Sequence, residues 1–187
     1  WLSAKVLRFS GSYLASARLP RVLQPTLNRL AALTADSFSA VVLDGDEVVI
    51  VARSGPSRVT AFGVHLGARL PAHATSTGRV LLAAKKKAEF NAWLRGRELP
   101  RLTMHTTVEH KAFRALIDQV RAQDFCVANE EHELGVFALA VPLRDLQGRT
   151  VAAINVVAGA HRADKMALQR EMLGVLADAA RELRPLL

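Results

Sequence analysis

The segment Asn129–Gly135 gathers side chains that could carry out acid–base or metal chemistry. It reads Asn-Glu-Glu-His-Glu-Leu-Gly, so three carboxylates surround the imidazole of His132. Carboxylates and imidazoles exchange protons and bind divalent metals. The spacing differs from the His-Glu-x-x-His pattern of zinc hydrolases, and no further cluster of His or Cys residues lies beside it. A helix-capping or turn role for these side chains is therefore an equally good interpretation.

A second segment, residues 75–84, has the composition of a helix start that could bind an anion. Thr75, Ser76 and Thr77 precede Gly78 and an apolar run. Free N–H groups at a helix start attract anions, and small residues let a ligand approach the backbone. The simpler alternative is an ordinary capped helix, because Thr and Ser are common N-cap residues.

Composition limits the remaining possibilities. The chain has 187 residues, half of them hydrophobic, which is enough for one domain with its own core. The net charge of +8 permits contact with nucleic acid or small anions, but the basic residues are scattered. The single cysteine, Cys126, cannot form an internal disulfide or a cysteine-rich zinc site, which favours a reducing, cytoplasmic setting. We expect no metal, no cofactor and no membrane span.

Hydrophobic periodicity predicts the elements that position the two segments. Hairpin signals dominate, so we expect an α+β domain with a mainly antiparallel sheet and helices packed on it. Thr106 and Glu109 form a possible capping box for a helix that carries Phe113 and Ile117. The predicted order begins with a helix over 3–16, a helix from Pro20 to residue 36, and strands over 39–43, 47–53 and 58–66. A helix over 75–84, a short helix with Phe90 and Trp93 on one face, a loop over 96–105 and the helix capped near Thr106 follow. The last elements are strands over 125–128, 136–143 and 150–157 and a helix ending near Pro185.

Together, these motifs resemble the effector-binding domain of the IclR family of bacterial transcriptional regulators. The matching stretches are residues 70–83 (LPAHATSTGRVLLA), 129–135 (NEEHELG), 138–142 (ALAVP) and 148–156 (GRTVAAINV). The resemblance covers essentially the whole chain. It implies a GAF/PAS-like sensor domain over residues 19–187, with a curved sheet flanked by helices. It also implies a linker helix over residues 1–18 that follows an absent N-terminal winged helix-turn-helix domain.

The sequence of residues 75–79, with Arg58 nearby, is most similar to one subgroup of that family. This subgroup regulates the catabolism of aromatic acids such as protocatechuate, 4-hydroxybenzoate or cis,cis-muconate. The resemblance thus implies a ligand sensor rather than an enzyme. Its partners would be a small, aromatic carboxylic acid effector, operator DNA bound through the absent domain, and further copies of the chain in a homodimer or homotetramer.

The resemblance also implies which residues contact the effector. Ser76 and Thr77 would bind the carboxylate through backbone and hydroxyl groups, as a helix start can. Ala138 and Val157 would be apolar walls for a ring. Asn129 stands where the family pattern usually has an acidic residue, and it would exchange a hydrogen bond with a ring hydroxyl.

For three further residues, contact with the effector has to be weighed against a purely structural role. Asn155 interrupts an apolar strand and needs a partner, which is either the ligand or neighbouring backbone. Arg58 and His65, on the predicted third strand, are candidate cationic anchors for an acid. Arg58 could instead end a surface turn, and His65 could be an ordinary strand histidine.

Two other functions stay open at this point. A small enzyme on a GAF-like fold would use Glu130, Glu131 or His132 as acid or base, but Cys126 in its apolar strand is a poor nucleophile. We therefore expect no catalytic residues. A dimerisation-only module with a vestigial pocket is the second alternative. Catalytic turnover would separate the enzyme from the sensor, and stabilisation by a ligand would separate the sensor from the module.

Overall fold

The computed structural model describes residues 18–55, 64–159 and 165–187. A six-stranded sheet lies at its centre, in the order β3-β2-β1-β6-β5-β4, and all neighbouring strands are antiparallel. This confirms the predicted α+β class. The strands are β1 (Ser37–Asp44), β2 (Glu47–Ser54), β3 (Arg69–Pro71), β4 (Cys126–Asn129), β5 (Val136–Arg144) and β6 (Thr150–Gly159).

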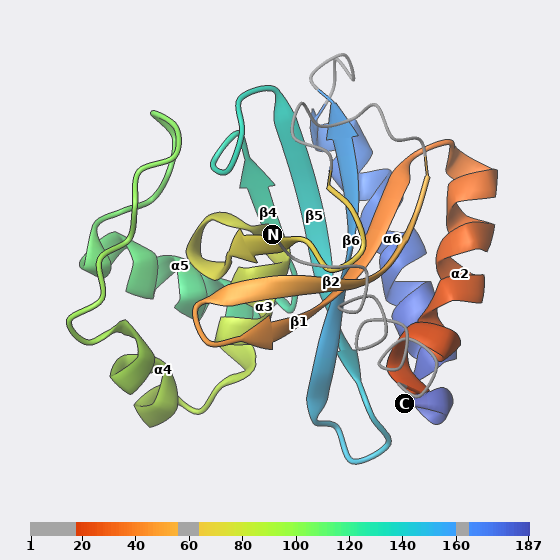
Figure 1. The fold of residues 1–187 in the computed structure, drawn as a ribbon, viewed down its shortest axis with the longest axis horizontal. Helices are drawn as coiled ribbons and strands as arrows, with labels where there is room; N and C mark the ends of the chain where they lie inside the picture. Colours follow the sequence, from red (N-terminus) through yellow and green to blue (C-terminus); the bar gives the residue numbers. More distant parts are fainter. Residues whose placement is uncertain (1–17, 56–63, 160–164) are drawn as a thin grey trace, which may run out of the picture.

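Helices cover both faces of the sheet (Figure 1). One face packs against α2 (Arg18–Thr34) and α6 (Lys165–Leu183), which is followed by the short helix η3 (Arg184–Leu186). The other face packs against α3 (Ser76–Ala84), α4 (Lys87–Leu94) and α5 (His110–Gln123), with the short helix η2 (Ala72–Ala74) just before α3. The sheet thus separates two hydrophobic cores.

Strand alternation decides which side chains reach each core. On β6, Ile154 and Val156 belong to the core under α2 and α6, whereas Ala153 belongs to the core under α3 and α5. A bulge in β2 changes this alternation, because Val41 pairs with Ile50 while Ala40 pairs with Ala52. Ile50 is therefore directed to the α3 side.

Most elements form where the sequence predicts them. The helix expected from Pro20 is α2, which buries Leu23, Leu27 and Leu30 at helical spacing. Thr75 caps α3, and Phe113 and Ile117 are buried on α5. The helix predicted over residues 3–16, like nearly all of the linker predicted over 1–18, lies outside the described residues.

The strand predicted over residues 58–66 is not observed in its described part, residues 64–66. The third strand is β3, which is shorter and begins at Arg69. The chain turns first at Gly67, which has a φ of +80° and donates its N–H to the Ile50 carbonyl at 2.8 Å. The regular antiparallel register with β2 begins at Arg69, which pairs with Val49.

The predicted capping box also differs from the structure. Glu109, not Thr106, caps α5, and its carboxylate accepts hydrogen bonds from the N–H groups of Lys111 and Ala112 at 3.0 and 2.7 Å. The Thr106 hydroxyl instead donates to the Glu131 carbonyl at 2.7 Å. A long-range partner has replaced the local one.

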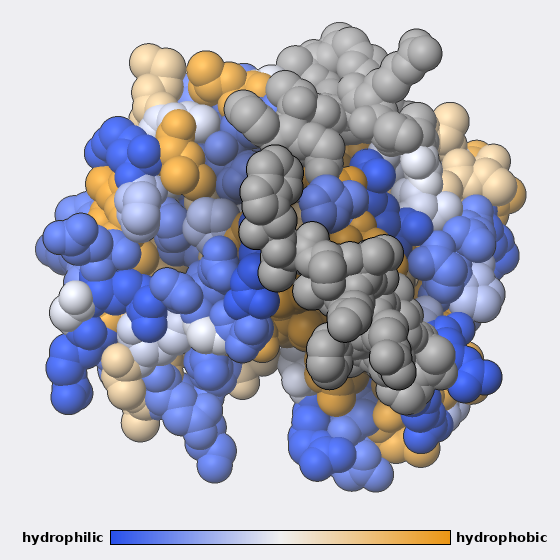
Figure 2. Space-filling view, in the orientation of Figure 1, coloured by the Kyte–Doolittle hydropathy of each residue, from blue (hydrophilic) through white to orange (hydrophobic). Residues whose placement is uncertain are grey.

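The surface visible in Figure 2 is mostly hydrophilic at its outer parts, with hydrophobic residues scattered between. In the part of the chain that the structure describes, no helix has both the length and the apolar character that crossing a bilayer requires.

Candidate functional site

A cavity of about 70 Å³ lies between the sheet and the start of α3. One buried water needs roughly 10–15 Å³, so the space admits a small molecule. The cavity is lined by all six strands, by the α3 start and by the β4–β5 loop. Its apolar walls are Val41, Ile50, Leu70, Ala128, Ala138 and Val157.

The start of α3 supplies hydrogen-bond donors to this cavity. The Thr75 hydroxyl accepts a hydrogen bond from the Gly78 N–H at 3.2 Å, which satisfies one of the first amides of the helix. The amides of Ser76 and Thr77 precede the first hydrogen bond within the helix and have no acceptor inside it. Both residues are buried and line the cavity. The helix dipole also favours an anion at this place.

Two buried polar atoms that face the cavity lack a hydrogen-bond partner. They are Oγ of Ser76, a residue that is 1% exposed, and Oδ1 of Asn155, a residue that is 8% exposed. Asn155 lies in the middle of β6, directly opposite Ser39 on β1. Because an unsatisfied buried polar atom costs about 1–3 kcal/mol, such atoms are rare away from functional sites.

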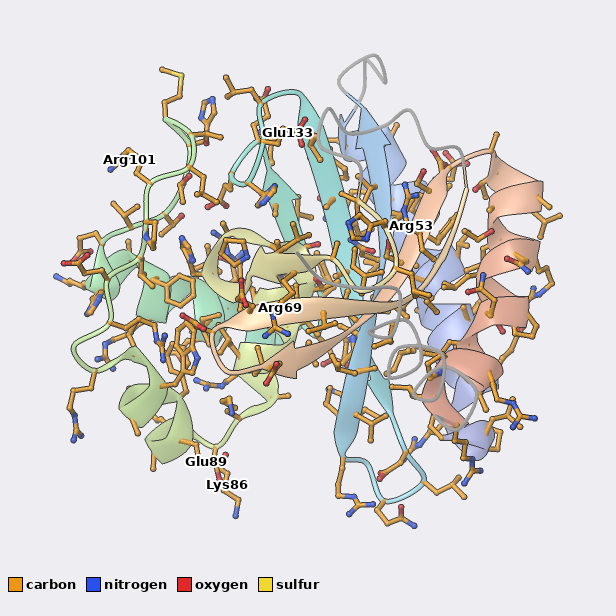
Figure 3. All side chains as sticks on the ribbon, viewed as in Figure 1. Arg53, Arg69, Lys86, Glu89, Arg101 and Glu133 are labelled. Atoms are coloured by element: carbon orange, nitrogen blue, oxygen red, sulfur yellow. The ribbon has the colours of Figure 1, made fainter. Side chains whose placement is uncertain are left out.

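The β4–β5 loop, Glu130–Gly135, forms the polar wall of the cavity, to which it contributes Glu131, His132 and Glu133. In Figure 3 the labelled Glu133 lies at the end of the sheet where β4 turns into β5. Burial lowers the pKa of His132, so this imidazole is neutral at pH 7 and can exchange hydrogen bonds with a ligand.

A buried ion pair fixes this loop to α3. Arg79 is fully buried, and both of its terminal nitrogens donate to the Glu131 carboxylate. The Arg79 Nε donates to the His73 carbonyl at 2.7 Å. Burial by itself raises the pKa of Glu131, but the hydrogen bonds and charge of Arg79 outweigh it and hold that pKa below its usual range. Glu131 is therefore an ionised acceptor at neutral pH.

Threonine hydroxyls hold the backbone of the same loop. Thr103 donates to the Glu130 carbonyl at 2.6 Å, and the Thr107 N–H and hydroxyl both donate to the Glu131 carboxylate at 3.0 Å. Glu130 adopts a φ of +56°, and its carboxylate accepts the Gly135 N–H at 2.8 Å. The acidic side chains thus mainly shape the loop.

The structure brings five predicted site residues to this one cavity, namely Ser76, Thr77, Ala138, Asn155 and Val157. Asn129 is exposed at the end of β4 and does not line it. His65 is also exposed and lines a separate hollow with Arg53, which is labelled in Figure 3. Arg58 lies outside the described residues.

Residues missed by the sequence reasoning also line the cavity. Ser39 is the direct cross-strand neighbour of Asn155, so only the register of β1 against β6 reveals it. His132 and Glu133 were interpreted from sequence as part of a loop, and nothing local shows that this loop folds back over the sheet.

The remaining reactive groups show little catalytic character. Burial raises the pKa of Cys126 to about 11, so its side chain is a thiol rather than a nucleophilic thiolate at neutral pH. Within residues 18–55, 64–159 and 165–187, no three His, Cys, Asp or Glu side chains come together as a metal site requires.

Comparison with known proteins relates this chain to a group of bacterial regulators. Residues 11–184 match the family described as "Bacterial transcriptional regulator IclR C-terminal". The chain is 47% identical to the p-hydroxybenzoate hydroxylase transcriptional activator of Acinetobacter baylyi, in an alignment covering all of this chain and 70% of that protein. It is 45% identical to the Pca operon regulatory protein of the same organism, covering all of this chain and 69% of that protein.

A solved structure shares this fold closely. It is the inducer-binding domain of a double mutant of the PobR transcription factor from Acinetobacter, in complex with 3-hydroxybenzoic acid. The TM-score is 0.85 at 45% sequence identity, and the match covers 90% of this chain and 98% of that one.

Proposed function

Since the chain belongs to the IclR family of bacterial transcriptional regulators, we propose that its cavity binds a hydroxylated aromatic monocarboxylic acid as the regulatory effector. The observation that carries this proposal is the pair of unpartnered buried atoms, Ser76 Oγ and Asn155 Oδ1, in an otherwise mainly apolar cavity. An aromatic acid with a ring hydroxyl offers an acceptor for the first atom, a donor for the second and a flat apolar body between them.

The effector carboxylate binds at the start of α3. It accepts hydrogen bonds from the Ser76 hydroxyl and from the amides of Ser76 and Thr77, where the helix dipole favours negative charge. No Lys or Arg is among the described residues that line the cavity. Among the described residues, the neutral donors of α3 are therefore the anchoring groups, and His65 lines a separate hollow. Arg58 lies outside the described residues and stays a predicted cationic anchor.

The ring lies on the sheet against Ala138 and Val157, which are on neighbouring strands and have directly paired Cα atoms. Small side chains at these positions leave room for the ring. Its hydroxyl donates to Asn155 Oδ1, which satisfies that buried acceptor. Asn129 is left out of this arrangement because it lies at the exposed end of β4.

Sensing fits these residues better than catalysis does. Of the acid–base candidates, Glu131 is ionised and bonded to Arg79 and Thr107, and the Glu130 carboxylate accepts the Gly135 N–H. Cys126 is a buried thiol. The named relatives are transcriptional regulators.

In the regulator as a whole, effector binding alters operator recognition by a winged helix-turn-helix domain outside residues 1–187, joined through the linker predicted over 1–18. The regulator acts as a homodimer or homotetramer. It acts in the cytoplasm, which contains the operator DNA. Effector binding is coupled to DNA binding if the effector-bound and empty states of this domain place the DNA-binding domains of the oligomer differently.

Calorimetric titration of the 187-residue chain tests the effector proposal. We expect saturable binding of 3-hydroxybenzoate, 4-hydroxybenzoate or protocatechuate, weaker binding of benzoate, and no binding of 4-hydroxybenzyl alcohol, which lacks the carboxylate. Absence of binding to every acid at millimolar concentration would refute the proposal. Equal binding of the acid and the alcohol would refute the role given to α3.

A further inference from the structure

Beyond the groups that touch the effector, we infer that the Arg79–Glu131 ion pair is a positioning device that sets the effector affinity by holding the polar wall of the cavity against α3. This inference rests on the proposed function. It concerns two residues of which one, Arg79, does not line the cavity.

The connection runs from the effector-anchoring helix to the opposite wall. Arg79 lies three residues after Ser76, so it belongs to the same rigid helix as the carboxylate-binding amides. Its guanidinium binds Glu131 with two parallel hydrogen bonds, a geometry that fixes orientation as well as distance. His132 and Glu133, the next two residues, line the cavity. The pair thus sets the separation between the two sides of the site.

The guanidinium has further fixed contacts. Its Nε binds the His73 carbonyl in η2, and its central carbon lies 6.0 Å from the ring centroid of Phe113 in α5. Glu131 is tied in turn to Thr107, just before α5. Because these contacts hold both Arg79 and Glu131 in place, the β4–β5 loop is preorganised before the effector arrives. Preorganisation reduces the entropic cost of binding.

The alternative is that the pair serves stability alone, and removing both charges together distinguishes the two roles. A single substitution leaves a buried charge unpaired and is strongly destabilising, whereas replacing both partners of a buried pair is often neutral. The test variant is therefore Arg79→Met with Glu131→Gln. The glutamine can still accept from the Thr107 N–H, so the loop keeps that contact and loses its connection to α3. Arg79→Met also removes the hydrogen bond to the His73 carbonyl.

We expect the double variant to melt close to the wild type but to bind 4-hydroxybenzoate about tenfold more weakly, because the wall is held from one side only. Amide hydrogen exchange at Gly135 and Val136 should become faster, while exchange in α6 stays unchanged. Arg79→Lys, which keeps the charge but not the paired geometry, should give an intermediate affinity.

The matched control is Arg144→Gln with Asp124→Asn. This removes another two-pronged pair, at 2.6 and 2.5 Å, that lies outside the cavity lining. It should leave both the affinity and the exchange of the loop unchanged.

Unchanged loop exchange in the Arg79/Glu131 variant would overturn the inference. The inference would also be overturned if the effector affinity of this variant returned to the wild-type value whenever its stability did. If the wild type binds no aromatic acid, the proposed function fails, and the exchange of Gly135 and Val136 still decides whether the pair holds the wall.

Discussion

Gly78 lies against Ala72 so closely that a Cβ atom on Gly78 would be 2.2 Å from the Ala72 carbonyl oxygen and 2.4 Å from its Cα. Both contacts are with backbone, which cannot rotate away as a side chain can. The first turn of α3 is therefore packed directly on η2. The glycine is required by this approach of two backbones and not by an unusual φ.

Gly78→Ala should lower the free energy of unfolding by about 3 kcal/mol, because α3 or η2 must move to admit the methyl group. Since α3 also carries Ser76 and Thr77, effector affinity should fall as well. The control is Gly174→Ala on α6, where a Cβ meets nothing within 4 Å. That variant should gain about 0.5–1 kcal/mol from helix propensity. Urea denaturation measures both, and equal effects would contradict the packing argument.

Ser76→Ala should reduce the affinity for hydroxybenzoates and for benzoate by a similar factor, about tenfold, since the lost hydroxyl contacts the carboxylate that they share. The stability of the empty domain should stay the same or rise slightly, because an unpartnered buried atom is removed. Titration and thermal unfolding of the same preparation check this. A loss of stability without a loss of affinity would show that Ser76 is structural.

Asn155→Leu should affect only effectors that carry a ring hydroxyl. The side chains are similar in size, and leucine removes the unpartnered Oδ1, so the empty domain should be at least as stable. The affinity for 4-hydroxybenzoate should fall about tenfold, whereas that for benzoate should change little. Parallel titrations of the two acids measure this difference. Equal losses would place the ring hydroxyl elsewhere.

Acids with a second carboxylate should bind worse than hydroxybenzoates. Glu131 and Glu133 both line the cavity, and like charges in a site of low dielectric repel one another. We therefore expect cis,cis-muconate to compete only weakly with 4-hydroxybenzoate. Glu133→Gln should narrow the difference. Displacement of 4-hydroxybenzoate by muconate at similar concentrations in the wild type would count against this reading of the wall.

Stability should decrease as the pH falls through the ordinary pKa of histidine, 6.5. Burial lowers the pKa of His73 and of His132 in the folded chain, so the unfolded chain binds protons first on acidification. The contribution of these two histidines to the free energy of unfolding is thus fully present above pH 6.5. It is lost as the pH falls toward their lowered pKa values in the folded chain. Below the ordinary pKa of glutamate, 4.5, protonation of Glu131 adds to the loss.

Denaturant titrations between about pH 8 and pH 5 measure this slope. His132→Gln should make it shallower. Substitution of the exposed His65 is the control. A slope that is identical in all three proteins would show that burial of His132 does not govern the titration.

Local patterns were sufficient to predict most of the fold. Leu23, Leu27 and Leu30 share one helix face whatever packs on it, and the Thr75 cap acts within its own turn. The capping box at Thr106 was wrong because its hydroxyl bonds to a carbonyl 25 residues away. Pairings of this kind depend on how segments meet, which no local pattern contains.

The site could be predicted only in part for the same reason. The resemblance in sequence pointed to Ser76 and Asn155, which line one cavity. Arg79 and Glu131 are 52 residues apart, and their ion pair exists only because the β4–β5 loop folds back on α3. Ser39 enters the cavity through the strand register alone.

The burial of Cys126 has a practical consequence for fluorescence work. It is the single cysteine of the chain, it is 2% exposed, and its thiol stays protonated at neutral pH, so maleimide dyes have no reactive thiolate to modify. A cysteine introduced at Leu134, which is 59% exposed in the β4–β5 loop, can therefore be labelled selectively. A dye at that position would convert the domain into an optical reporter of aromatic acids without any change to its native thiol.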